Sequence, residues 1–372
     1  KLALIVVILV LTVGSFMAYQ AATGSETAYN IPRMLGMEGV GGETMRLAGP
    51  PTTDIKGPFV ETHPAAVSMD RDLRDLPQTR PEHKRPMREM GQLPTIDRNA
   101  GPDPVVQTSD TVGNRPVGQL AVAPAPLTSF IGLDFKTWGA GWPPDTHGDV
   151  GPSHYIQVVN TSIGVFDKTT GTRLTAFTFD SFFSGNGASG TCASLNQGDP
   201  IVVYDQVSGR WIITDFAFSG SGTTPPYYEC IAVSKTADPV SGGWWLYTVT
   251  ASTTALNDYP KLGIWNDGIY MSANMFNNGQ TYGGVKLWAF NRDDLISGAP
   301  LRSVAFTLGT AYFSLLPANL KGALAPAGTS EYFMSDYGSN TSMKLWKFTT
   351  NWANPSSSTL TGPQSFSVAS FT

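Results

Sequence analysis

The chain has 372 residues, a formal net charge of −5 at pH 7 and only 14% charged residues. An average soluble domain carries about 25% charged residues, and the low fraction here, with 39 glycines and 13 tyrosines, is typical of extracytoplasmic β-proteins. The acidic balance argues against a nucleic-acid partner, which would call for a basic face. All nine tryptophans lie after residue 137, so the front third cannot build an aromatic core.

Residues 2–19 form one uncharged, mostly apolar stretch. About 18 such residues make roughly 27 Å of helix, nearly the thickness of the hydrocarbon core of a bilayer. A cleaved signal peptide is the alternative, but bulky residues around Tyr19 leave a poor small-x-small cleavage site. We therefore expect a transmembrane signal-anchor helix over 1–19. Lys1 would mark the cytoplasmic side of the inner membrane, with the bulk of the chain on the periplasmic side.

The next segment, 20–127, contains 14 of the 27 prolines and only Tyr29 and Phe59 as aromatic residues. It cannot bury enough apolar area to offset its chain entropy, which predicts a flexible linker or an extended Pro-rich arm. We favour an arm that straps the protein to partner subunits. Its scattered apolar side chains would dock one at a time: Ile31, Met34, Met37, Met87 and Met90.

Residues 128–372 are predicted to be all-β, because short β-branched and aromatic runs alternate with Gly-, Asn- and Ser-rich turns. One pattern of two β-runs joined by a turn occurs four times, with Phe166, Val233, Phe290 and Phe348 at intervals of 67, 57 and 58 residues. Further short runs lie between these pairs, at 244–249 and 301–306.

A repeat of this length favours a β-propeller of about five blades, within a range of four to six, and a β-sandwich is the alternative. The strictly alternating run 365–371 could pair with a strand near 130–133. Such pairing would close the ring and remove its free edges. The predicted domains are therefore the anchor helix at 1–19, the arm at 20–127 and the propeller at 128–372.

Four motifs in this part of the chain resemble a group of bacterial extracytoplasmic β-propeller proteins of sialidase-like architecture. That resemblance implies a fold and a compartment, because most members of the group have no assigned reaction. It covers about 130–275 well, and His147 departs from it where Asn is usual. The motifs are PPDTHGDVGP at 143–152, GDPIVVYD at 198–205, YYECIAVS at 227–234 and DYPKLG at 258–263.

The two cysteines, Cys192 and Cys230, both lie in the predicted propeller. They would be buried thiols in a cytosolic protein, and a disulfide is the better interpretation in an exported one. The resemblance also implies that they pair.

Asp145 and Asp149 flank His147 at alternate positions, a spacing with which side chains converge on a hard cation. They are a possible calcium site, and the alternative is that both carboxylates brace turns. Calcium is the only cofactor that the sequence suggests.

Asp199 and Asp258 each lie at a comparable edge of a predicted inner strand, so they could ring a central funnel as a cation or sugar site, or serve as turn caps. A glycosidase pair drawn from the strand carboxylates is a further alternative, although structural roles are favoured and no catalytic residue is assigned. Those carboxylates are Asp215, Glu229, Glu331 and Asp336.

These features favour a non-catalytic accessory subunit. The bilayer would hold it through residues 2–19. Its propeller would dock onto a larger membrane protein complex, photosynthetic or respiratory, which the arm would stabilise. The alternative is a secreted or surface protein that binds or cleaves glycans through the propeller funnel.

Overall fold

The computed structural model describes residues 46–47, 53–81, 127–140, 143–188, 190–220, 222–336 and 339–370. Residues 47–372 form one compact unit, and Arg46 is the only described member of a second unit, 1–46. The expected anchor at 1–19 and the arm residues Ile31, Met34, Met37, Met87 and Met90 lie outside the described residues. No helix within the described ranges is long and apolar enough to cross a membrane.

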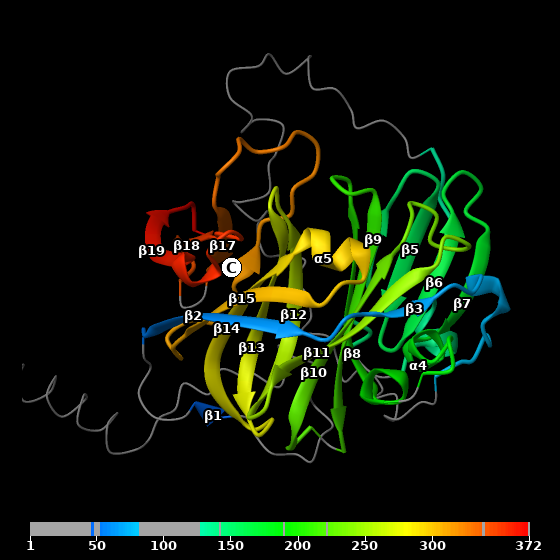
Figure 1. Cartoon of the computed structure of the whole chain (residues 1–372), viewed down its shortest axis with the longest axis horizontal. Coiled ribbons are helices and arrows are strands. Elements are labelled where there is room, and N and C mark those ends of the chain that lie inside the picture. Colours follow the sequence, from blue (N-terminus) through cyan, green and yellow to red (C-terminus); the bar gives the residue numbers. More distant parts are fainter. Residues whose placement is uncertain are drawn as a thin grey trace, which may run out of the picture. The chain divides into compact units, whose positions relative to one another are not determined.

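The described part of the chain is all-β, with a few short helices and four antiparallel sheets (Figure 1). In each sheet, four strands follow one another in chain order, which is the local pairing that short turns favour. The first sheet comprises β4 (His147–Val150), β5 (His154–Val159), β6 (Ser162–Asp167) and β7 (Arg173–Thr178). The second comprises β8 (Asn196–Asp205), β9 (Arg210–Ser219), β10 (Thr224–Ser234) and β11 (Trp244–Ser252).

The third sheet comprises β12 (Ala255–Ile264), β13 (Gly268–Asn277), β14 (Thr281–Asn291) and β15 (Leu301–Leu308). The fourth comprises β16 (Leu316–Pro317), β17 (Glu331–Ser335), β18 (Ser342–Thr349) and β19 (Thr359–Ser367). Each predicted repeat is therefore the middle pair of strands of one sheet, and the predicted runs at 244–249 and 301–306 are the fourth strands of the second and third sheets.

Helices occupy only short connections between these strands. Residues such as Asp134, Thr178 and Asn291 begin them, each accepting a hydrogen bond from the backbone of the first turn. The helices are η1 (Leu73–Asp75), α3 (Phe135–Trp138), α4 (Phe179–Phe183), η2 (Thr191–Ala193), α5 (Arg292–Ser297) and η3 (Pro355–Ser357).

Successive sheets stack face to face, and a fully buried tryptophan lies in each of the three interfaces. Trp211 on β9 packs between the first and second sheets, Trp288 on β14 between the second and third, and Trp346 on β18 between the third and fourth. The innermost strands contact each other in turn, β4 with β8, β8 with β12 and β12 with β16. Four sheets rather than two rule out the β-sandwich alternative.

The predicted ring closure through 365–371 is wrong. The strand β19 pairs with β18 at the edge of the fourth sheet, and 130–133 forms no strand. Those residues instead lie over the first sheet, where the backbone N–H of Leu133 donates to Gln157 Oε1 at 2.6 Å. An alternating pattern specifies a strand with one buried face, and it does not specify the strand's partner.

The segment 53–81 contains two strands, which its Pro-rich composition did not predict. The strand β2 (Ile55–His63) pairs with β15 of the third sheet, and β3 (Val67–Met69) pairs with β11 of the second (Figure 1). The following turn reaches the first sheet, where Thr175 Oγ1 donates to the carbonyl of Leu73 at 3.2 Å. This segment has no core of its own, because it pairs with the open edges of existing sheets. A further two-residue strand is β1 (Arg46–Leu47).

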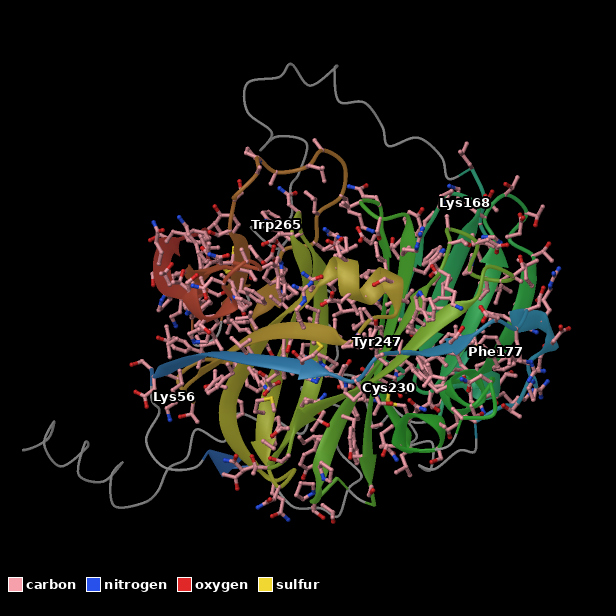
Figure 2. The ribbon with its side chains drawn as sticks, in the orientation of Figure 1. Lys56, Lys168, Phe177, Cys230, Tyr247 and Trp265 are labelled. Carbon is pink, nitrogen blue, oxygen red and sulfur yellow. A yellow bond between two sulfur atoms is a disulfide. The ribbon has the colours of Figure 1, made fainter. Side chains whose placement is uncertain are left out.

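The predicted disulfide is present. Cys192 in η2 and Cys230 on β10 are bonded, which ties a connection that follows the first sheet to the middle of the second (Figure 2). No free cysteine remains in the described part of the chain.

Candidate functional site

Each innermost strand has one residue, within the strand or just before it, in the same unusual backbone conformation. These are four of the five non-glycine residues with positive φ among the described residues. Such a conformation costs of the order of 1–3 kcal/mol per residue and persists only where the surroundings enforce it. The four residues are Asp145 (φ 43°), Asp199 (φ 51°), Tyr259 (φ 53°) and Ser314 (φ 48°).

A side chain from the preceding sheet holds three of these residues in place. The backbone N–H of Asp199 donates to Asn160 Oδ1 at 2.8 Å, and that of Tyr259 donates to Asp199 Oδ2 at 3.0 Å. In the same way, the N–H of Ser314 donates to Asn274 Oδ1 at 2.8 Å. These hydrogen bonds join neighbouring sheets at the residues whose backbone is strained.

Three carboxyl groups meet at this end of the strands. The side chain of Asp199 on β8 interacts electrostatically with that of Asp145, which precedes β4, and with that of Asp258 on β12. Two carboxyl groups that interact in this way resist being ionised together, so the trio must share protons.

Burial increases from the mouth of this cluster to its floor. Asp145, Tyr259 and Lys261 are partly exposed, whereas Asp199 is 9% exposed and Asp258 only 1%. In the described part of the chain, no N–H or hydroxyl group makes a hydrogen bond of normal geometry to either carboxyl oxygen of Asp258. A buried charge without a partner is costly, so Asp258 is a protonated group facing its neighbours.

The pKa values of the cluster follow from this burial. Burial, followed by the charge of Asp199, raises the pKa of Asp145 to about 7. The same two causes raise the pKa of Asp258 well above its usual range. Burial also raises the pKa of Asp199, but the charge of Lys261 and the N–H of Tyr259 oppose that rise. Asp199 is therefore the member best placed to carry the negative charge.

Two more carboxyl groups lie deeper, on the second sheet. Glu229 on β10 accepts a hydrogen bond from Asn257 Nδ2 at 2.8 Å, and burial raises its pKa to about 8. Burial, and then the charge of Glu229, raises the pKa of Asp215 on β9 well above its usual range. Both side chains are fully buried, so they extend the cluster inward as protonated groups.

Asn160, which follows β5, joins two members of the cluster. Its Nδ2 donates to the Asp145 carboxylate and, at 3.2 Å, to the carbonyl of Pro143, while its Oδ1 accepts from Asp199. The chain makes room for it through Gly198, where a Cβ atom would lie 2.7 Å from Asn160 Oδ1. The side-chain amide of Asn160 thus positions both the carboxylate of Asp145 and the backbone of Asp199.

The opposite ends of the innermost strands are covered by the 318–330 loop of the fourth sheet. Lys321 Nζ donates to Asp149 Oδ2 at 2.5 Å, beyond the start of β4. Gln206 Nε2 donates to the carbonyl of Gly322 at 2.8 Å, beyond the end of β8, and Leu320 N donates to the carbonyl of Ile264, the last residue of β12, at 2.9 Å. The loop is therefore hydrogen-bonded to the first, second and third sheets.

The structure separates the two residues of the predicted calcium pair. Asp149 accepts from the N–H of Tyr204 at 2.7 Å and from Lys321, whereas Asp145 belongs to the carboxyl cluster. His147 Nδ1, between them in sequence, accepts from the N–H of Val202 at 3.4 Å. Among the residues that the structure describes, no group of three or more His, Cys, Asp or Glu side chains is arranged to hold a metal ion.

The predicted funnel residues Asp199 and Asp258 do lie together. Of the four strand carboxylates, Asp215 and Glu229 approach them, while Glu331 lies near Asp267 in another part of the core. Neither Asn160 nor Lys261 was predicted to belong to a site. The DYPKLG motif contains Lys261, but only the stacking of the sheets shows which charges surround it.

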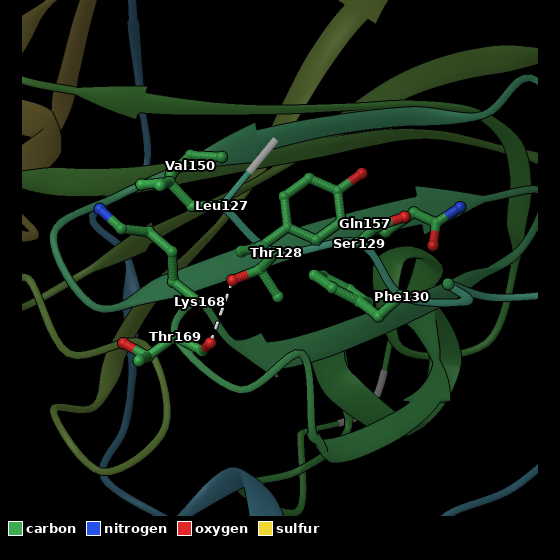
Figure 3. Close-up of a pocket in the computed structure, with 10 residues that line it drawn as sticks. Leu127, Thr128, Ser129, Phe130, Val150, Gln157, Lys168 and Thr169 are labelled. Carbon is green, nitrogen blue, oxygen red and sulfur yellow. Dashed lines mark hydrogen bonds between the residues drawn. The ribbon is translucent and has the colours of Figure 1, made fainter. Parts of the chain in front are cut away.

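A separate pocket of about 730 Å³ lies over the first sheet (Figure 3). The 127–132 segment and the turns next to Val150 and Lys168 form its walls, and Tyr155 and Gln157 contribute from β5. The described residues that line it share no member with the carboxyl cluster and contain no carboxyl group.

No known protein family matches the sequence, and no curated protein is similar to it. Several solved structures share part of the fold. The native arabinanase of Bacillus subtilis is 12% identical, with a TM-score of 0.32, and the match covers 59% of this chain and 80% of that one. The GH43 endo-arabinanase of Bacillus licheniformis is 13% identical, with a TM-score of 0.29, covering 62% of this chain and 94% of that one.

An exo-β-1,3-galactanase from Phanerochaete chrysosporium is 12% identical, with a TM-score of 0.33. That match covers 59% of this chain and 49% of the galactanase, so the chain spans about half of the fungal enzyme's length. At such low identities and TM-scores, no residue of these enzymes is matched to a residue here.

These comparisons correct the expectation of a non-catalytic scaffold subunit. The solved structures named above are an arabinanase, an endo-arabinanase and an exo-β-1,3-galactanase, and none of them is a scaffold subunit. Raised pKa values in a group of neighbouring carboxyl groups mark this cluster as a candidate functional site.

Proposed function

We propose that the protein is a glycoside hydrolase whose active site is the Asp145–Asp199–Asp258 cluster. The observation that carries the proposal is the half-exposed carboxyl of Asp145, with its pKa raised to about 7, beside a second carboxyl, Asp199, whose charge contributes to that rise. Cleavage of an acetal needs an acid for the leaving oxygen and a negative charge near the cationic transition state, and two carboxyl groups that share one proton offer both.

The roles follow from burial and charge. Asp145 is still partly protonated at neutral pH and donates its proton to the glycosidic oxygen as the C–O bond breaks, because a catalytic acid works best with a pKa near the working pH. A water molecule then forms the new C–O bond to the sugar and returns a proton to Asp145. Asp199 carries the negative charge that stabilises the oxocarbenium-like transition state. Asp258 stays protonated on the floor of the site and keeps the charge localised on Asp199.

We also propose that the propeller arrangement of the four stacked sheets forms the funnel through which a glycan reaches the cluster. The face-to-face stacking and the alignment of the innermost strands support this arrangement. The Cys192–Cys230 disulfide supports a location outside the cytosol, where such bonds persist. Anchorage to a membrane through residues 2–19 stays a prediction.

The test is incubation of the purified protein with a panel of neutral and acidic polysaccharides, with new reducing ends and product masses as readouts. Asp145→Asn should lower kcat/KM by about 10²- to 10⁴-fold, the usual contribution of a general acid. The matched control is Asp149→Asn, four residues further along the chain on β4 and outside the cluster, which should keep its activity. Binding of a polysaccharide without cleavage would contradict the hydrolase and point to a lectin.

A further inference from the structure

Lys261 is a cation placed among the carboxyl groups of the site without being paired to one. Its Nζ donates to the carbonyl of Pro260 at 2.9 Å and lies 3.4 Å from the ring centre of Tyr259. None of the ion pairs found among the described residues involves Lys261. An ammonium group has three N–H donors, so this partly exposed side chain keeps donors for a ligand.

The carboxyl groups around Lys261 do not give the site a large negative charge. Below about pH 7, Asp145 is largely protonated, and Glu229, with a pKa of about 8, holds its proton at still higher pH. Burial also raises the pKa of Asp258 well above its usual range. His147 also faces Lys261, and burial followed by the charge of Lys261 lowers its pKa, which keeps its imidazole neutral. Lys261 and the shared charge of Asp199 are therefore the two charges that a bound sugar meets.

An ammonium with unused donors beside a proton-donating carboxyl fits a sugar that itself carries an anion. We propose that the glycan cleaved here is acidic, a polymer that contains uronic acid, and that Lys261 binds a carboxylate of that sugar. The aromatic ring of Tyr259 supports the ammonium from one side and fixes its position. This inference rests on the proposed hydrolase, since it names the substrate class of the same site.

The experiment compares uronic-acid polysaccharides, such as polygalacturonate and polyglucuronate, with the same polymers after chemical reduction of their carboxyl groups. The paired substrates share linkage and length and differ only in charge. The wild-type protein should prefer the acidic member of a pair by about 10- to 100-fold in kcat/KM, the range expected for one charged hydrogen bond. Lys261→Gln should remove that preference, and Lys261→Arg should restore most of it.

The matched control is Lys286→Gln. Lys286 on β14 is also partly exposed, donates to one backbone carbonyl (Ala251, 3.0 Å) and lies over an aromatic ring (Trp288, 4.7 Å), but it lies outside the cluster. Its variant should keep the substrate preference. If Lys261→Gln lowered kcat/KM equally on the acidic and the reduced polymers, the inference would be overturned. Lys261 would then only balance the negative charge of the carboxyl cluster.

The outcomes also separate this inference from the proposed function. Cleavage of neutral polysaccharides alone overturns the acidic-substrate inference and leaves the hydrolase standing. Cleavage of no polysaccharide overturns the hydrolase and this inference with it.

Discussion

Two aspartates on the same strand, six residues apart, show how the surroundings decide the role of a buried carboxylate. Asp205, at the end of β8, is fully buried. It accepts from Val207 N at 2.9 Å, Ser208 Oγ at 2.7 Å and Arg292 Nε at 2.8 Å. Asp199, near the start of β8, is also buried, but other carboxyl groups are its neighbours.

The two aspartates differ in their hydrogen-bond partners, so Asp205 has a structural role and Asp199 can take part in proton transfer. Both carboxyl oxygens of Asp205 accept hydrogen bonds, and Arg292 also donates to the carbonyl of Asn266 at 2.6 Å, so that end of the strand is held by a hydrogen-bonded network. Around Asp199, the described residues offer fewer N–H and O–H donors than carboxyl oxygens. Some of these carboxyl groups must therefore be protonated. General acid–base catalysis requires neighbouring groups that differ in pKa and can exchange protons.

The largest effect is expected where this hydrogen-bonded network is broken. Asp205→Ala would leave Arg292 buried without its carboxylate, and loss of one partner of a buried ion pair costs about 3–5 kcal/mol in the free energy of unfolding. Asp199→Asn keeps an acceptor for Tyr259 N and removes a charge from a crowded site, so its unfolding free energy should change by less than about 1 kcal/mol. Denaturant unfolding of both variants measures the contrast, and equal losses would refute it.

A smaller effect is expected in the pH dependence of the free energy of unfolding. The pKa of Glu229 rises from 4.5 to about 8 on folding because the side chain is buried. The folded state therefore holds more protons than the unfolded state between these values, so this contribution to stability is complete below about pH 4.5 and is lost as the pH rises through about 8. We expect a loss of roughly 2–4 kcal/mol across this window.

Glu229→Gln should flatten that part of the stability curve in urea unfolding at a series of pH values. The other raised carboxyl groups, Asp145 and Asp258, act in the same direction and should leave some slope behind. A variant with the wild-type slope would show that Glu229 is ionised in the folded protein.

The smallest effect tests the amide that joins the trio. Asn160→Ala removes the donor that favours the ionised form of Asp145, so the pKa of Asp145 should rise further. Glycan cleavage should fall by about 10-fold, the equivalent of about 1.4 kcal/mol, and the alkaline limb of the pH–rate profile should move to higher pH.

The control for this variant is Asn274→Ala. Asn274 makes the equivalent hydrogen bond to Ser314 but touches no carboxyl group of the cluster. This variant should leave the alkaline limb unchanged. A shift of the limb in both variants would mean that loosened sheets, and not a lost hydrogen bond to Asp145, cause the effect.

The residue pattern alone predicted the all-β class, the middle strands of all four sheets and the disulfide. It could do so because hydrophobic alternation and turn residues act over a few positions, and because the chain has only two cysteines. It also singled out Asp145, Asp199 and Asp258, each beside a predicted inner strand.

Only the tertiary structure decided which of these aspartates act together. Asp145 was paired with Asp149 by spacing, yet stacking of the sheets brings it to Asp199, 54 positions away, and turns Asp149 toward Lys321. Asn160, Lys261 and the strands of 53–81 escaped prediction for the same reason. Their roles come from neighbours that are distant in sequence, and burial and charge among such neighbours exist only once the sheets have packed.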